Sequence, residues 1–272
     1  MVKALFLTLF LLSNLGAYSL EKDIISLMGK SSYHSNKGLI SVLFKDKQEF
    51  LRGSEADLVK VTKVLKENDL LDLKLKHISD IELSFATHQK NALLFIKLIK
   101  EVLSSSGYSK TLTTKALRDN SGFLWRVKLR SSQMIDPYLI ASELQKRGAI
   151  ATKIKRQSID RYRYNIDISD AHVKAIKPTI DKELVLKKPL SAYWIDIYGA
   201  YIIKIVSKAG NAWHPYVVFY DSNLKIISNY TKERKSYNIS LKIPKNARYI
   251  KISDLYTLQN IKRGMKITVR KR

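Results

Sequence analysis

The sequence contains no cysteine, which excludes disulfide bridges, thiolate catalysis, thiolate metal ligands and a lipid-modified cysteine. Glycine is scarce as well, with 10 residues among 272, and these form neither a G-x-G-x-x-G fingerprint nor a phosphate-binding loop. Acidic side chains number 24 against 49 basic ones. The chain must therefore fold by packing alone, and its strong positive charge predicts anionic partners.

Patterns of catalysis and metal binding are also missing. No two histidines lie within four residues of each other, so the metal-binding spacings H-x-x-x-H and H-E-x-x-H do not occur; the five are His34, His77, His88, His172 and His214. There is no G-x-S-x-G elbow and no S-x-x-K at the start of a helix. We therefore expect a non-enzyme without cofactor or metal; an enzyme with a composite site is the third hypothesis for the function.

The first 19 residues are typical of a secretory signal peptide. Lys3 supplies a positive start, residues 4–12 are apolar, and small residues (Gly16, Ala17 and Ser19) precede a charged stretch. The alternative is an uncleaved membrane anchor, but the apolar run of about 13 residues is shorter than the roughly 20 that span a bilayer. We therefore expect cleavage and a periplasmic location.

The positive charge rises along the chain. Residues 20–76 carry 11 basic and 9 acidic side chains, residues 77–185 carry 19 and 11, and residues 186–272 carry 18 and 4. Behind a signal peptide, the polyanions within reach are envelope glycans, lipid head groups and acidic proteins, not nucleic acid. The alternative is a general enrichment of lysine on every solvent-exposed surface.

Residues 20–76 are predicted to form a small helical unit. A short helix starts near Asp23 and ends at Gly29, the polar residues 31–37 interrupt it, and residues 39–51 continue helically. Ser54 is the predicted N-cap of a further amphipathic helix, with Asp57 in its first turn.

Residues 77–170 contain an internal repeat of strand, helix and strand. Each helix has a cap signal at its start and a glycine, Gly107 or Gly148, after its end. Two such units predict a ferredoxin-like βαββαβ domain, with both helices on one face of an antiparallel sheet. The strands are expected at residues 81–85, 110–117, 123–129, 151–156 and 162–168, and the helices at 91–103 and 137–145.

The order of these elements and the pattern of the second unit resemble the small peptidoglycan-binding domains of sporulation-related-repeat proteins. That resemblance implies an envelope protein that contacts peptidoglycan. Ferredoxin-like folds also serve as assembly modules in secretion and pilus machinery, so the fold class alone does not select between the two roles.

Residues 171–184 are interpreted as a linker, and residues 185–272 as an antiparallel β-sandwich, jelly-roll-like or immunoglobulin-like. Seven short strands separated by turn signals carry this prediction; they are expected at residues 192–198, 201–207, 216–220, 225–230, 237–243, 248–253 and 266–269. The stretch KIPKNARYIKI, residues 242–252, resembles the penultimate strand of carbohydrate-binding jelly rolls.

Strand alternation divides the aromatic residues of this sandwich between two faces. Trp213, Pro215, Val217 and Phe219 are expected in the core. The outward set is a candidate ligand-binding face, since flat rings beside polar groups suit sugar rings; it comprises Trp194, Tyr198, His214, Tyr216 and Tyr220, bordered by Lys204 and Lys225. The alternative is that these rings pack against the neighbouring domain.

A second candidate site is an anion-binding surface on the middle domain. It comprises cations that alternate with apolar residues on two strands: Arg126, Lys128, Arg130, Arg161 and Arg163. They are expected on the helix-free face of the sheet, and the alternative is an ordinary solvated face.

Together these features predict an exported, non-catalytic protein of a Gram-negative-type envelope. Its basic C-terminal sandwich would bind an anionic glycan, such as peptidoglycan, or a periplasmic protein partner, with peripheral contact to a membrane surface as a further option. The alternative function is a scaffold subunit that contacts only protein.

Overall fold

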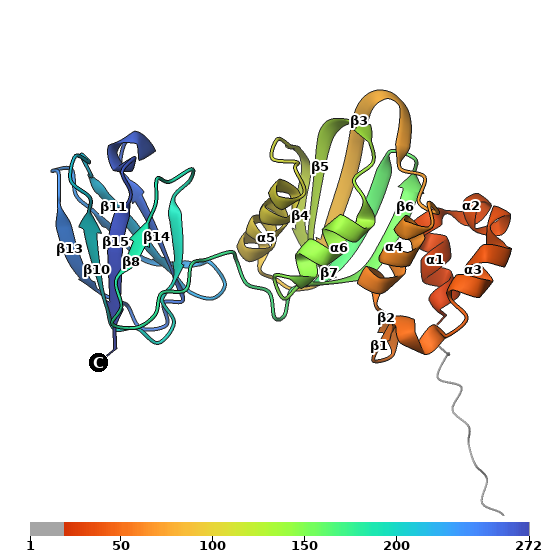
Figure 1. The fold of residues 1–272 in the computed structure, drawn as a ribbon, viewed down its shortest axis with the longest axis horizontal. Helices are drawn as coiled ribbons and strands as arrows, with labels where there is room; N and C mark the ends of the chain where they lie inside the picture. The colour runs from red at the N-terminus through yellow and green to blue at the C-terminus, as the bar shows by residue number, and fades with distance from the viewer. Residues whose placement is uncertain (1–18, 272) are drawn as a thin grey trace, which may run out of the picture.

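The computed structural model describes residues 19–271. It contains N-terminal helices, a five-stranded sheet covered by helices, and two four-stranded sheets at the C-terminal end (Figure 1). The predicted signal peptide lies outside the described residues, apart from Ser19. In the described part of the chain, no helix has the length and apolarity needed to cross a membrane.

The N-terminal unit is more helical than predicted. Its elements are α1 (Leu20–Met28), α2 (Lys30–Ser35), α3 (Lys37–Leu43), a 3-10 turn (Lys47–Phe50), the hairpin β1 (Leu51–Arg52) and β2 (Glu55–Ala56), and α4 (Leu58–Glu67). Residues 31–37, expected as an interruption, are almost wholly helical. The predicted N-cap was wrong: Ser54 lies in the hairpin turn, and Asp57 caps α4 by accepting hydrogen bonds from Val59 N (3.1 Å) and Lys60 N (3.4 Å).

The middle part has the predicted run of strands and helices, together with a parallel pairing of two strands that was not predicted. Its elements are β3 (Lys74–Thr87), α5 (Ala92–Ser105), β4 (Leu112–Asp119), β5 (Gly122–Gln133), α6 (Pro137–Gln145), β6 (Ile150–Ser158) and β7 (Arg161–Asp167), and the sheet order is β4-β5-β3-β7-β6. The β6–β7 hairpin places β7 between β6 and β3, where it runs parallel to β3. The sheet is therefore mixed, not wholly antiparallel as expected, and the ferredoxin-like assignment stays a prediction.

Strand alternation gives this sheet one apolar and one polar face. The apolar face carries large buried rings, including Phe85, Trp125, Tyr162 and Tyr164, which lie under the helices (Figure 1). Burial raises the pKa of the Tyr162 hydroxyl to about 12. The opposite face carries the charged residues of the same strands and has no helix over it in the described chain.

The segment predicted as a linker is partly hydrogen-bonded to the sandwich. Ile176 N donates to Trp194 O (2.8 Å), and Asp196 N donates to Ile176 O (2.9 Å). Val173 is buried in the core of the middle part. Contacts at both ends restrict this segment, so it does not act as a free tether.

The C-terminal part is a sandwich of two four-stranded antiparallel sheets. Its strands are β8 (Leu184–Leu186), β9 (Tyr193–Asp196), β10 (Ile202–Ser207), β11 (Pro215–Tyr220), β12 (Ile226–Thr231), β13 (Asn238–Lys242), β14 (Tyr249–Asp254) and β15 (Met265–Arg270), in the orders β13-β10-β15-β8 and β12-β11-β14-β9. Apolar residues of both sheets, such as Ile195 and Ile267, share one core with Trp213. Strand β8 was not among the seven predicted, and the choice between jelly-roll and immunoglobulin-like topology stays a prediction.

Candidate functional site

The predicted aromatic face does not form one open surface. Trp194 and Tyr220 lie side by side, with ring centroids 5.0 Å apart. Lys97 of α5 places its ammonium nitrogen 4.6 Å from the centroid of the Trp194 ring. These two aromatic residues pack against the core of the middle part, which is the alternative that strand alternation alone left open.

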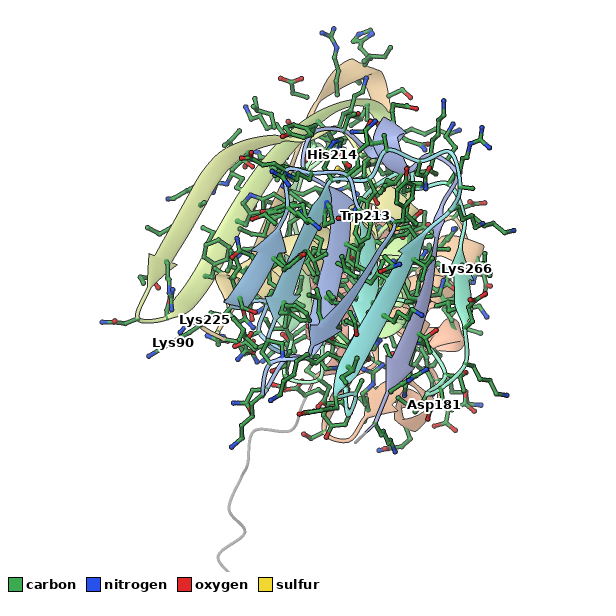
Figure 2. The ribbon with its side chains drawn as sticks, turned by 90° about the vertical axis from the view of Figure 1, so that its left-hand side faces the viewer. Lys90, Asp181, Trp213, His214, Lys225 and Lys266 are labelled. Carbon is green, nitrogen blue, oxygen red and sulfur yellow. The ribbon has the colours of Figure 1, made fainter. Side chains whose placement is uncertain are left out.

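Neighbouring residues of the sandwich extend this contact. Leu224 and Tyr249 are buried with the middle part, and Asn91 Nδ2 donates to Asn223 Oδ1 at 2.8 Å. Lys225 lies near Lys90 at the same place (Figure 2). Much of the predicted ligand-binding face is thus occupied by the packing of the sandwich against α5.

Tyr216 shares the outward sheet face of Trp194 and Tyr220, whereas Lys204 lies in the other sheet. Tyr216 is half-buried on the outward face of its sheet, in register with Thr231 and Ser253. Lys204 belongs to β10 in the other sheet, where it pairs with Ser240 and Thr268. The prediction that Lys204 borders the aromatic set was therefore wrong, because strand alternation assigns a face within a sheet but does not assign the sheet.

His214 directly precedes β11, at the end of the strand that is far from Tyr220. It contacts the buried carboxylate of Asp254. Its backbone N–H donates to Asp254 Oδ2 (2.7 Å), and its ring Nδ1 lies 3.6 Å from the same oxygen. The carboxylate also accepts from Tyr256 N (2.9 Å), Thr257 N (3.0 Å) and Asn260 Nδ2 (3.0 Å). Asp254 therefore organises the turn after β14, and it ties His214, which precedes β11, to that turn.

The ionisation of Asp254 follows from these partners. Burial acts to raise the pKa of its carboxyl, but the hydrogen bonds from His214, Thr257, Tyr256 and Asn260 outweigh burial, and the pKa lies below the usual range. A carboxylate that is ionised and fully hydrogen-bonded is a poor general base. The geometry thus favours a structural role for the His214–Asp254 pair.

Tyr198 has a different setting, at the open end of the sandwich opposite His214. The side chain is 73% exposed. It lines a groove of about 1110 Å³ together with residues of two turns, among them Tyr201, Lys242, Lys245 and Arg248. The guanidinium carbon of Arg248 lies 4.7 Å from the Tyr198 ring centroid, and Lys242 Nζ lies 5.3 Å from that of Tyr201.

The side chain of Asp196 holds the two sides of this groove in place. Arg248 Nη2 donates to Asp196 Oδ2 at 2.8 Å, and Tyr198 N donates to Asp196 Oδ1 at 3.0 Å, so one carboxylate orients both sides of the Tyr198–Arg248 pair. Asn246 adopts a φ of 67° in the turn between β13 and β14, a conformation that asparagine tolerates well. The groove thus combines two tyrosine rings with three cations.

The five cations predicted for the middle part do share one face. On β5, Arg126, Lys128 and Arg130 alternate with buried apolar residues, and on β7 Arg161 and Arg163 alternate with buried tyrosines. Arg126 Nε lies 3.2 Å from Ser84 Oγ and 3.4 Å from Glu82 Oε1. The common face of these five cations is the helix-free one (Figure 1).

No family model matches the chain, and no curated protein matches it. A solved structure that is similar in part is described as a fucose-binding module of Streptococcus pneumoniae; it is 20% identical, with 33% of this chain and 69% of that chain covered and a TM-score of 0.24. A TM-score this low carries no argument about the fold or ligand of this chain.

Sequence reasoning missed Tyr201, Lys242 and Arg248 as groove residues. Their signal was present in two turns, at Gly199 and at residues 244–246, each flanked by aromatic or basic residues. What placed the turns together is the pairing of β14 with β9, which sets Tyr249 opposite Asp196. Within residues 19–271, no group of three or more His, Asp or Glu side chains could hold a metal ion.

Proposed function

We propose that this chain is an exported, non-catalytic binding protein of a Gram-negative-type envelope, and that its sandwich binds an anionic glycan such as peptidoglycan. The observation that carries the proposal is the groove at the open end of the sandwich, where the exposed ring of Tyr198 and the half-buried ring of Tyr201 lie beside cations. Ring faces offer stacking area to sugars, and the cations attract carboxylates.

The charge of the surrounding sandwich supports an anionic ligand. Residues 186–272 carry 18 basic and 4 acidic side chains, a net charge of 18 − 4 = +14. Asp196 already pairs with Arg248, while Lys242 and Lys245 form no ion pair within the described chain. Such a field raises the local concentration of a polyanion and the rate of its association, and salt weakens both effects.

Sedimentation with purified cell-wall sacculi tests the proposal. The mature chain is expected to pellet with sacculi at low salt and to be released as salt rises. Tyr198→Ala should weaken pelleting about fivefold, because an exposed stacking ring contributes about 1 kcal/mol. The pair Lys242→Gln and Lys245→Gln should weaken it by a similar factor.

Tyr237→Ala is the matched control. Tyr237 is also an exposed tyrosine of the sandwich, but it lies outside the groove, so its loss should leave pelleting unchanged. Absence of pelleting at low salt, or equal loss with Tyr198→Ala and Tyr237→Ala, would overturn the glycan proposal.

The scaffold hypothesis is favoured by a different observation, an exposed apolar pair on α3. Leu39 and Val42 are three residues apart on that helix, and both are exposed. Protein partners often cover such a pair. Chemical crosslinking in envelope extract distinguishes the hypotheses, because a scaffold would yield one specific protein partner and no affinity for sacculi.

A further inference from the structure

The helix-free face of the five-stranded sheet carries a row of side chains that crosses all five strands. Strand pairing sets Lys115 opposite Arg126, Arg126 opposite Ser84, Ser84 opposite Arg163, and Arg163 opposite Lys155. Residues that are paired across neighbouring strands point to the same side of a sheet. With strands about 4.8 Å apart, this cationic row is about 19 Å long.

The rows on either side make the face amphipathic. One contains Leu117, Leu124, Ala86, Asn165 and Lys153, and the other contains Leu112, Lys128, Glu82, Arg161 and Ser158. The three rows together hold seven cations and a single carboxylate, Glu82, which lies beside Arg126. Leu112 is 68% exposed and Leu117 is 42% exposed, both on the edge strand β4.

Two adjoining hollows lie on this face. The first, about 140 Å³, is lined in part by Ala86, Leu117 and Leu124, and the second, about 240 Å³, by Lys153, Lys155 and Gln157. Arg163 and Asn165 belong to both. Asp119 stands at the rim of the first hollow, where its carboxylate is occupied by hydrogen bonds from Ser121.

Three of the four cations of the row are available to a ligand, the exception being Arg126 beside Glu82. Within residues 19–271, Lys115, Lys155 and Arg163 form no ion pair with a carboxylate. The yellow-green strands β4 and β5 curve clear of the sandwich, so the sandwich does not cover this side of the sheet (Figure 2).

We propose that this face docks on an anionic lipid surface, with lipid phosphates along the cationic row and Leu112 and Leu117 at the level of the head groups. Each basic side chain near such a surface contributes about 1 kcal/mol of attraction, and exposed apolar side chains add to it. The proposal concerns a different domain and a different ligand from the sandwich groove, so either can fail without the other.

The chemistry of the face favours lipid over other polyanions. The large rings of β3, β5 and β7 all point to the helix side, so the face offers no aromatic platform on which bases or sugar rings could stack. A soluble polyanion would be attracted by the cations but would gain nothing from the exposed leucines. An amphiphile with a phosphate head group uses both.

Co-sedimentation of the mature chain with vesicles tests the proposal. Binding is expected to vesicles of phosphatidylcholine with one-third phosphatidylglycerol, and not to pure phosphatidylcholine. Replacing Lys155→Gln and Arg163→Gln together should weaken binding by about 20- to 30-fold, since two cations of about 1 kcal/mol each are removed. Leu117→Ser should weaken it by about threefold or more, because apolar area is lost.

Two further variants serve as checks. Lys45→Gln with Lys47→Gln removes the same charge from the exposed surface of the N-terminal unit and should leave binding within about twofold, since these cations lie off the sheet. Asn165→Asp is nearly isosteric, places a carboxylate between the two hollows and should weaken binding at unchanged far-ultraviolet circular dichroism.

The results of these experiments distinguish a lipid surface from a soluble polyanion as the ligand. Equal loss of binding in the Lys155/Arg163 and Lys45/Lys47 double variants would show a non-specific charge effect and overturn the proposal. So would competition by soluble polyphosphate combined with unchanged binding of Leu117→Ser, because a polyanion site has no use for the leucine. Tyr198→Ala should reduce sedimentation with sacculi and leave vesicle binding intact, which keeps this proposal distinct from that for the sandwich.

Discussion

Lys97 of α5 holds its ammonium nitrogen 4.6 Å from the centre of the Trp194 ring on β9, and this contact joins the middle part of the molecule to the sandwich. The same lysine pairs with Glu101 at 2.7 Å, one helical turn further along α5. The lysine therefore lies between a carboxylate and a ring face, an arrangement that orients it without burying its charge fully.

Trp194→Ala is expected to loosen this contact and to lower the free energy of unfolding by about 2 kcal/mol, because a half-buried ring is removed from packing with Tyr220. Lys97→Met keeps the aliphatic stem and loses only the charge, so the expected loss is about 1 kcal/mol. Denaturant unfolding measures both. Lys100→Met, at an exposed position on the same helix, is the control and should change little.

A second prediction compares two cations that pair with the same carboxylate. Arg147 Nη1 and Lys146 Nζ each lie 2.6 Å from a Glu143 oxygen, but the Arg147 side chain is 8% exposed and that of Lys146 is 68% exposed. Arg147 also donates to Ser105 Oγ at 2.7 Å, which links α6 to α5.

Arg147→Met should therefore destabilise the chain by about 3 kcal/mol, since the hydrogen bonds from its buried guanidinium to Glu143 and Ser105 are lost. Lys146→Met should change stability by less than about 0.5 kcal/mol, because solvent screens an exposed pair. Chemical denaturation of the two variants is the measurement. Similar losses in both would mean that burial does not decide the strength of these ion pairs.

Asp254 gives a prediction about pH. Its burial acts to raise the pKa, but its hydrogen bonds lower the pKa of the folded state overall, so ionised Asp254 stabilises the fold. That stability is fully present above the unfolded-state pKa of about 3.9 and is lost as the pH falls through the lower folded-state pKa.

Asp254→Asn should cost about 2 kcal/mol at pH 7, because an amide cannot accept all of the hydrogen bonds that the carboxylate accepts. The difference from the unsubstituted chain should shrink as the pH is lowered below about 4, where the carboxylate of the unfolded chain becomes protonated before that of the folded chain. Urea unfolding at pH 7 and pH 3 checks this. A difference that stays constant with pH would contradict the assignment of the charge to Asp254.

Prediction from the sequence was most successful for properties that depend on a single strand or helix, such as the face on which a side chain lies. Alternation along residues 213–219 correctly placed Trp213, Val217 and Phe219 in the core. The same rule placed Arg126 and Arg163 on one face of a sheet. Both predictions need only the two-residue period of a strand, which is local to the chain.

Pairing between distant segments was harder to predict. Strand β7 lies between β3 and β6, and its parallel pairing with β3 joins residues that are far apart in the sequence, such as Glu82 and Arg161. In the same way, His214 was predicted to lie on an open aromatic face, yet it contacts Asp254, 40 residues away in sequence. Local patterns carry no information about such contacts.

The sequence by itself determined which side chains point inward and outward on each strand and where the positive charge accumulates. Only the tertiary structure decided that Trp194 and Tyr220 pack against the core of the middle part, that Tyr198 faces an open groove with Arg248, and that Lys115 to Lys155 form one row. The physical reason is that periodicity specifies the face of an element, whereas the surface lying against that face depends on how separately formed elements pack.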